Sequence, residues 1–430
     1  MQASVALVAA VALGIASVVA QDRGEGLVEI TRAEGNESVY VMGATHHGCV
    51  PYGDDGAFVL VHRLPISRAR GDDGSKMDLE LWRAHAGGAT WRRVGVAPTR
   101  FDGEGSIVRD GSLLAVCWSS CDGKRWSDAW FQRFDPEREA WIGEPLRLTD
   151  ATGEVNQHFV TDLARAANGA LVAVVGCDGP LPFPLGNFCG STGVRILPAG
   201  SSEWTPMQKA NDTILGVCGN ALVRGDRVDV TYRTNPSAAA HGLRMVDVTK
   251  AELLPPMPPI TSSDPADDEQ IANVGQWCGD DVGGRTLLFL RGAQAAGKGR
   301  LSVAHDRGDG VFVVRDVADD PALVAGNETN EFFTLARGHG DQAHVCFAKR
   351  TDDCTELWHA TLSGGEVVRA PRVVARMAPQ AFAALNGMRA PDAASTMLCV
   401  IGSLAAEDGA GVVRAYGRWP LRNVAPRPGR

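Results

Sequence analysis

The chain has 430 residues, of which 44% are hydrophobic and 22% are charged, a balance typical of a folded globular protein. Its formal net charge is −9 and it has no block of basic residues, which argues against a general nucleic-acid partner, because phosphate neutralisation dominates such binding. The 50 glycines and the low aromatic content of 6% suit many short strands joined by tight turns.

The first 20 residues predict an export signal. They contain no charged side chain, are mostly Ala and Val, and end in small residues before Gln21. The alternative is an uncleaved anchor, since about 20 apolar residues can span a bilayer. Cleavage is favoured because Ala and Val are less apolar than the residues of Leu-rich anchors. We therefore expect a signal peptide at 1–20, a secreted or periplasmic protein, and no membrane span after cleavage.

The ten cysteines form an even set in a chain predicted to be exported, which favours disulfides. Three local pairs each flank a turn-rich loop, and the absence of a Cys-x-x-Cys motif disfavours the alternative of a zinc site. The predicted disulfides are Cys117–Cys121, Cys177–Cys189 and Cys346–Cys354, and the pairing of Cys49, Cys218, Cys278 and Cys399 is left open.

A β-rich run recurs along the chain with a period of about 50 residues. Another short strand-like run precedes it, a third follows it, and a fourth often opens with tryptophan, as at Trp91, Trp141 and Trp204. The seven recurring runs cover residues 56–63, 111–118, 169–177, 227–233, 285–291, 342–349 and 395–402.

Four strands per unit and seven units predict an all-β fold, a seven-bladed β-propeller with four-stranded blades. Six or eight blades are the alternatives within this class, and a sandwich pair or a β-helix lacks this sevenfold period. The last unit has no fourth strand of its own, so residues 27–31 are expected to close the last blade. The predicted organisation is a signal peptide at 1–20, a closing strand and lead-in at 21–43, a propeller domain at 44–422 and a tail at 423–430, in a monomer.

Two segments resemble the Asp-box repeat of sialidases, Ser-x-Asp-x-Gly-x-Thr-Trp. Residues 84–91 keep Gly88, Thr90 and Trp91, and residues 304–308 keep Asp306 and Gly308. In that family the box forms the turn between the third and fourth strands, where the strand count also places it. The chain therefore resembles a secreted sialidase-like (BNR/Asp-box) propeller. The family's Arg-Ile-Pro motif is missing, since residues 49–51 read Cys-Val-Pro.

Propellers usually place their site on the face where inner strands begin and second strands end. Five of the seven predicted blades place Arg or Lys on the loops or strand ends of that face, and a guanidinium matches carboxylate or sulfate geometry. The alternative is that these arginines simply end strands in solvent. The predicted substrate-binding residues are His46, Arg63, Arg125, His158, Arg233, Arg291 and Arg350.

Two chemistries fit the candidate catalytic residues. In a sialidase-like hydrolase, Tyr232 would act with Glu104 or Glu331, and Asp128 could serve as the acid. In a lyase similar to ulvan-lyase-type propellers, His47, Tyr232 and Arg233 would supply the base, the acid and the cation.

The sequence thus predicts an exported, carbohydrate-active propeller that acts on an anionic glycan, with a glycosidase favoured over a polysaccharide lyase and a non-catalytic binding propeller. No cofactor is predicted. Calcium is the candidate ion, at the acidic stretches 53–56, 71–74 and 264–269, for which solvated loop charge is the alternative.

Overall fold

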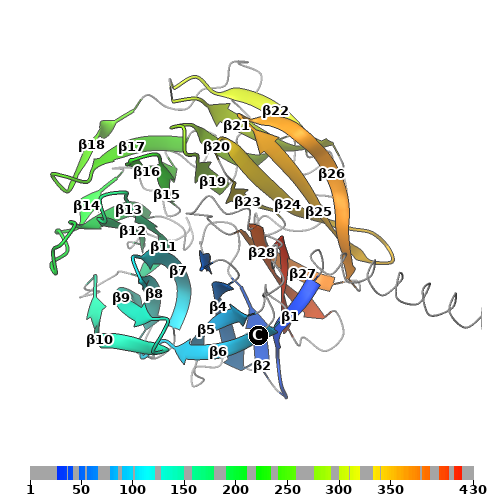
Figure 1. Cartoon of the computed structure of the whole chain (residues 1–430), viewed down its shortest axis with the longest axis horizontal. Coiled ribbons are helices and arrows are strands. Elements are labelled where there is room, and N and C mark those ends of the chain that lie inside the picture. Colours follow the sequence, from blue (N-terminus) through cyan, green and yellow to red (C-terminus); the bar gives the residue numbers. More distant parts are fainter. Residues whose placement is uncertain are drawn as a thin grey trace, which may run out of the picture.

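The computed structural model is an all-β ring of sheets (Figure 1). The described strands form seven sheets, six of four strands and one of five. No helix in the described part of the chain is long and apolar enough to cross a membrane. The structure describes residues 27–35, 37–41, 48–53, 56–65, 78–85, 90–99, 102–121, 127–149, 157–178, 190–210, 219–233, 241–257, 276–291, 300–308, 310–319, 333–338, 340–377, 380–387, 397–405 and 411–418.

Each sheet is an antiparallel blade, and in blades 2 to 6 neighbouring strands follow one another along the chain. Blade 1 consists of β2 (Glu37–Tyr40), β3 (Cys49–Tyr52), β4 (Gly56–Pro65), β5 (Asp78–His85) and β6 (Thr90–Val96). Blade 2 consists of β7 (Asp102–Asp110), β8 (Leu113–Cys121), β9 (Ser127–Asp135) and β10 (Ala140–Arg147). Blade 3 consists of β11 (Gln157–Arg165), β12 (Leu171–Asp178), β13 (Gly190–Leu197) and β14 (Gln208–Lys209). Blades 4 and 5 consist of β15 (Ala221–Arg224), β16 (Arg227–Arg233), β17 (His241–Asp247) and β18 (Glu252–Pro256); and β19 (Gln276–Gly279), β20 (Arg285–Arg291), β21 (Arg300–Asp306) and β22 (Val313–Asp319). Blades 6 and 7 consist of β23 (Phe333–Arg337), β24 (Gln342–Arg350), β25 (Thr355–Ser363) and β26 (Glu366–Met377); and β27 (Gln380–Gly387), β28 (Met397–Ala405), β29 (Gly411–Arg418) and β1 (Leu27–Arg32).

The ring is closed by the first strand of the chain. β1 pairs antiparallel with β29 and forms the outer strand of blade 7, with Leu27 opposite Tyr416. Inner strands of neighbouring blades contact one another from β3 through to β27, and β28 meets β2 and β3. The predicted propeller fold and its closure by an N-terminal strand are therefore confirmed.

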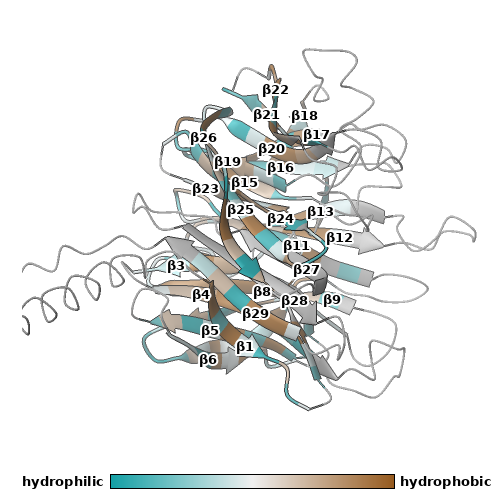
Figure 2. Cartoon of the chain, turned by 90° about the vertical axis from the view of Figure 1, so that its right-hand side faces the viewer, coloured by the Kyte–Doolittle hydropathy of each residue, from teal (hydrophilic) through white to brown (hydrophobic). Residues whose placement is uncertain are grey.

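Apolar side chains between neighbouring blades form the core. Seven buried clusters occur in the described residues, one at each of the seven blade interfaces. On β8, Val116 and Trp118 pack toward blade 1, while Ala115 and Cys117 pack toward blade 3. Because both faces of a blade are covered, its strands carry apolar residues at successive positions. Figure 2 accordingly shows hydrophobic residues along the strands of all blades.

The inner strand of blade 1 is split into two segments. β2 pairs with the end of β4, with Tyr40 opposite His62, and β3 pairs with its beginning, with Cys49 opposite Val59. Only two residues of β4 separate these pairs, whereas eight residues separate Tyr40 from Cys49 along the chain. The predicted lead-in 21–43 therefore supplies a strand to the first blade as well as the closing strand.

The Asp-box resemblance at residues 304–308 corresponds to a real turn. Asp306 ends β21, and its Oδ1 accepts the backbone N–H groups of Gly308 at 2.7 Å and Gly310 at 2.9 Å. Both glycines have positive φ, 103° and 86°, which a residue without a Cβ adopts at no steric cost. The turn connects the third and fourth strands of blade 5, as the resemblance implies.

Blades 2 and 4 contain the same aspartate turn without the motif. Asp135 and Asp247 each accept the backbone N–H groups two and three residues further on, at 2.9 to 3.1 Å. The residue four positions after each aspartate, Glu139 or Ala251, has a positive φ of 52° or 57°. Gly310 occupies the same position after Asp306, so the three turns share a positive φ there, although Asp306 accepts the N–H groups two and four residues further on.

Two of the predicted disulfides are wrong. Cys117, Cys346 and Cys354 are free thiols. Cys117 and Cys121 lie on the one strand β8, where four residues span about 13 Å, and a disulfide needs Cα atoms within about 7 Å. Cys354 lies beyond the last pair of the β24–β25 hairpin, again at least four residues along the strand from Cys346. The third predicted pair, Cys177–Cys189, falls outside the described side chains.

Candidate functional site

The predicted site face is called the upper face here: the inner strands begin there and the second strands end there. Of the predicted residues, His158, Tyr232 and Arg63 have described side chains on this face. Glu104, Arg233, Arg291 and Arg350 lie on β7, β16, β20 and β24, with only their backbone described, and His46, His47, Arg125 and Glu331 lie outside the described residues.

His46 and His47 are predicted to open the inner strand of blade 1, and both lie outside the described residues. That strand begins on the upper face at Glu37, which pairs with Pro65 at the end of β4. The two histidines belong to residues 42–47, between the segments β2 and β3. The sequence placed them at the strand start because the run 49–52 is the more obvious strand partner of residues 56–63.

The structure brings His158 against Asp128. His158 is the second residue of β11, the inner strand of blade 3, and Asp128 is the second residue of β9 in blade 2. His158 Nδ1 lies 3.6 Å from Asp128 Oδ1, and the imidazole is 13% exposed. At 3.6 Å this contact is longer than a hydrogen bond, so the carboxylate orients the imidazole by electrostatic attraction only, with Nε2 on the far side of the ring, an arrangement compatible with a general base.

Asp128 is itself fixed by two neighbours. Its Oδ2 accepts two hydrogen bonds from the Arg147 guanidinium, one of them from Nε at 2.8 Å. Its Oδ1 accepts the Thr149 hydroxyl at 2.8 Å, and that hydroxyl oxygen also accepts the backbone N–H of Ala129. A carboxylate that accepts a guanidinium is a hydrogen-bond acceptor rather than a proton donor, so this environment does not suit the acid role predicted for Asp128.

Arg147 adds positive charge to this part of the upper face. It ends β10, the outer strand of blade 2, and its side chain is 43% exposed. Arg147 is not among the predicted site residues, which were expected at the beginnings of inner strands and the ends of second strands. The feature of the sequence that could have identified Arg147 is its place at the upper end of the fourth strand of the blade. There it pairs with Trp130 of the third strand.

Tyr232 packs between blades 3 and 4. Its ring is 6% exposed and belongs to the apolar cluster that contains Val174 and Val230. It also lies over Gly242, where an added Cβ would come within 2.3 Å of the ring. The nucleophile predicted for a hydrolase is therefore largely covered by the core.

Arg63 is held by the neighbours of the closing strand. Its Nη1 donates to Glu37 at 2.7 Å and its Nε to Glu80 at 3.0 Å, while Nη2 donates to the Thr31 hydroxyl at 3.0 Å. Glu80 has no exposed side-chain surface and also accepts Arg93. The guanidinium thus joins β1, β2 and β5, which is a structural role.

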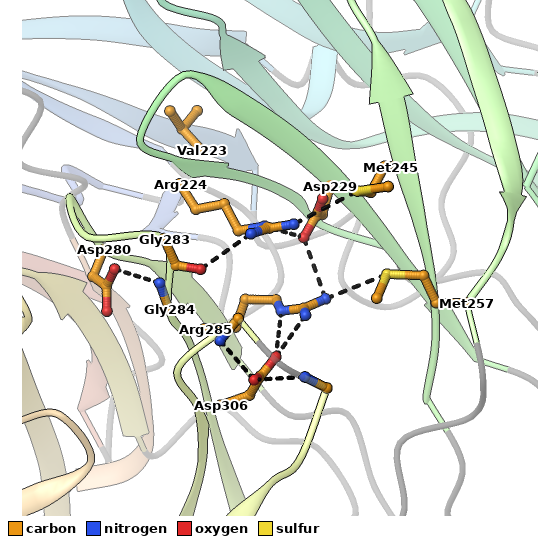
Figure 3. Close-up of polar contacts among 12 residues, drawn as sticks. Val223, Arg224, Asp229, Met245, Met257, Asp280, Gly283, Gly284, Arg285 and Asp306 are labelled. Atoms are coloured by element: carbon orange, nitrogen blue, oxygen red, sulfur yellow. Dashed lines mark hydrogen bonds and ion pairs between the residues drawn. The ribbon is translucent and has the colours of Figure 1, made fainter.

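The largest buried ion-pair network lies at the opposite face, between blades 4 and 5 (Figure 3). Arg224 donates to Asp229 at 2.6 Å, and Arg285 bridges Asp229 to Asp306, with its Nε 2.8 Å from Asp306 Oδ2. Arg285, Asp229 and Asp306 have no exposed side-chain surface. Two arginines balance two carboxylates there, so the network braces the blades rather than receiving a ligand.

The described residues contain no group of three side chains suited to hold a metal ion. Of the calcium candidates, stretches 71–74 and 264–269 lie outside the described residues, as do residues 54 and 55 of the stretch 53–56.

Comparisons with known proteins agree on the fold. No family model and no curated protein matches the sequence. A solved polysaccharide lyase, an ulvan lyase bound to a GlcA(1-4)Rha3S glycan, matches with a TM-score of 0.56 at 11% identity, over 90% of this chain and 95% of that chain. The polysaccharide lyase Uly1 matches with a TM-score of 0.49 at 8% identity, over 91% and 99%. A microbial sialidase matches with a TM-score of 0.45 at 10% identity, over 72% and 63%. The propeller neighbours thus include polysaccharide lyases and a sialidase, and the ulvan lyase supports the fold over nearly the whole chain.

Proposed function

We propose that this propeller is an exported carbohydrate-active enzyme that cleaves an acidic polysaccharide by β-elimination at the upper face of blades 2 and 3. The contact between His158 and Asp128 carries the proposal. The ulvan lyase that shares the fold was solved with a glucuronate-containing glycan, which supports an anionic glycan as the partner.

The reaction needs a base beside an acidic sugar. The base removes the C5 proton of the uronate, the C4–O bond breaks, a C4–C5 double bond forms, and the leaving oxygen takes up a proton. His158 Nε2, on the side of the ring away from Asp128, would take the C5 proton. Arg147 would offset the carboxylate charge that makes C5 hard to deprotonate, and Arg233 ends β16 on the same face.

A hydrolase is less well supported by the described side chains. Its nucleophile, Tyr232, is covered by the core of blades 3 and 4, and Asp128 accepts Arg147 where an acid is required. The sialidase resemblance is carried by the Asp-turns, and these lie at the lower face and stabilise turns. A turn motif of this kind stabilises the fold and does not define the chemistry.

The test is a panel of uronate-containing, sulfated and sialylated polysaccharides with three readouts. Ultraviolet absorbance of an unsaturated uronate supports the lyase. New reducing ends without that absorbance, or released sialic acid, contradict the lyase and indicate a hydrolase. If the protein is retained on an anionic glycan column but forms no product, the lyase is contradicted and a non-catalytic binding propeller is indicated.

The same assay tests the residue roles. His158→Gln removes the base and should lower the rate at least about 100-fold, and Asp128→Asn should lower it by a smaller factor because the imidazole loses its fixed orientation. The matched control is His85→Gln, since His85 ends β5 at the lower face and contacts Arg92 there. Equal activity of His158→Gln and the wild type would remove His158 from the mechanism.

A further inference from the structure

Asp102 is a buried carboxyl at the upper end of the inner strand of blade 2. Its side chain has no exposed surface, and its Oδ1 accepts the hydroxyl of Thr99 in the linker between blades 1 and 2. The Thr99 oxygen in turn accepts the indole N–H of buried Trp118 at 2.7 Å. Asp102 Oδ2 has no hydrogen-bond partner among the described residues. A buried carboxylate oxygen without a donor carries a large desolvation penalty when it is charged.

The surroundings of Asp102 compensate a charge poorly. The linker and β8 present the neutral groups of Thr99, Ser120 and Trp118, and β5 presents Asp78, whose charge repels a second carboxylate. Burial above all raises the pKa of Asp102 to about 7, against the opposing effect of the hydrogen bonds from Thr99 and Ser120. This carboxyl therefore has a pKa near neutrality, and the described residues around it include no cation that would stabilise its charge.

Asp102 also lies close to the candidate site in the fold. It pairs with Ser120, and Ser120 pairs with Asp128, so all three share one row across blade 2. One residue separates Asp102 from Glu104, where the β7–β8 register shifts. A shift of register at a strand end re-aims the residues beside it and weakens the local pairing.

We propose that Asp102 is a pH-sensitive latch between blades 1 and 2: its neutral carboxyl holds Thr99 against the upper end of β7, and its ionisation loosens this contact. The sign follows from linkage. The pKa of Asp102 is higher in the native state than in the unfolded state. Its contribution to the free energy of unfolding is therefore fully present at a pH below the unfolded-state pKa, and it is lost as the pH rises to the native-state pKa. The latch is independent of the proposed enzymatic activity.

Hydrogen exchange of the whole protein between pH 4 and pH 8 tests the latch. In peptides that cover residues 98–110, and after correction for intrinsic exchange, the opening equilibrium should rise about tenfold per pH unit up to pH 7 and then level off. Peptides from β12 in blade 3 should lack this dependence. A flat profile for 98–110 in the wild type overturns the proposal without the need for any variant.

Two variants on the same strand sharpen the test. Asp102→Asn cannot ionise, so it should abolish the pH dependence and protect residues 98–110 better than the wild type at pH 8. Asp110→Asn, at the lower end of β7, removes a carboxylate that accepts Arg133 and Arg165 at 2.9 Å each. It should lower overall stability yet keep the pH profile of residues 98–110. Retention of the wild-type profile by Asp102→Asn contradicts the latch.

Discussion

At the scale of single residues, the charged side chains divide into those that brace blades and those that remain for chemistry. Arg285 belongs to the first kind, because it is fully buried and its guanidinium contacts both Asp229 and Asp306. The replacement Arg285→Leu would leave two carboxylates facing each other without their common cation. We expect it to lower the free energy of unfolding by about 3–5 kcal/mol in denaturant titrations.

The matched control for Arg285 is Arg300→Leu in the same blade. Arg300 pairs with Asp316 at 3.1 Å, but the two side chains are 48% and 33% exposed, so water screens the pair. Its loss should cost at most about 1 kcal/mol. Similar losses for the two variants would show that the network of Figure 3 contributes no more than a surface ion pair.

At the scale of elements, the strands were predictable and the turns were only partly so. The runs on β4, β8 and β24 combine apolar residues with flanking glycines or other turn residues, and these signals are local. The Asp-box resemblance located the turn at Asp306 but missed those at Asp135 and Asp247. Those two turns keep only the aspartate and a residue with positive φ, and φ cannot be read from a sequence when the residue is not glycine.

The cysteine error has a similar origin. Spacing along the chain suggested short loops, but Cys117 and Cys121 lie on a single extended strand, and distance along a strand grows by about 3.3 Å per residue. The partnership of His158 with Asp128 was also beyond the sequence, because it joins the second residues of strands in different blades. Such contacts depend on how neighbouring blades pack, and this packing cannot be predicted from the sequence of one repeat.

The positive φ of Ala251 gives an element-scale prediction. An alanine in the left-handed region carries a steric cost of about 1 kcal/mol that glycine does not. Ala251→Gly should therefore stabilise the protein by up to about 1 kcal/mol and raise its Tm. Ala199→Gly, in the corresponding turn of blade 3 at a residue without positive φ, should instead be neutral or slightly destabilising. A loss of stability in Ala251→Gly would mean that contacts of the methyl group outweigh the strain.

At the scale of the whole molecule, stability depends on how the ring is closed, because blade 7 is completed only when β1 pairs with β29. An open ring would expose the edge of β29 and the apolar cluster that includes Ile30 and Val413. The hydrogen bonds of Arg63 to Thr31, Glu37 and Glu80 attach the end of β1 to blade 1.

Replacing Arg63 should therefore loosen the closing strand. Arg63→Met should lower the free energy of unfolding by about 2–3 kcal/mol and raise hydrogen exchange in residues 27–32, because Glu37 and Thr31 lose their shared donor. Arg93→Met is the control, since Arg93 pairs with the same Glu80 oxygen but is 53% exposed. It should leave exchange in residues 27–32 unchanged. If both variants raise that exchange equally, the ring is held through Glu80 alone and the contacts of Arg63 to the closing strand add nothing.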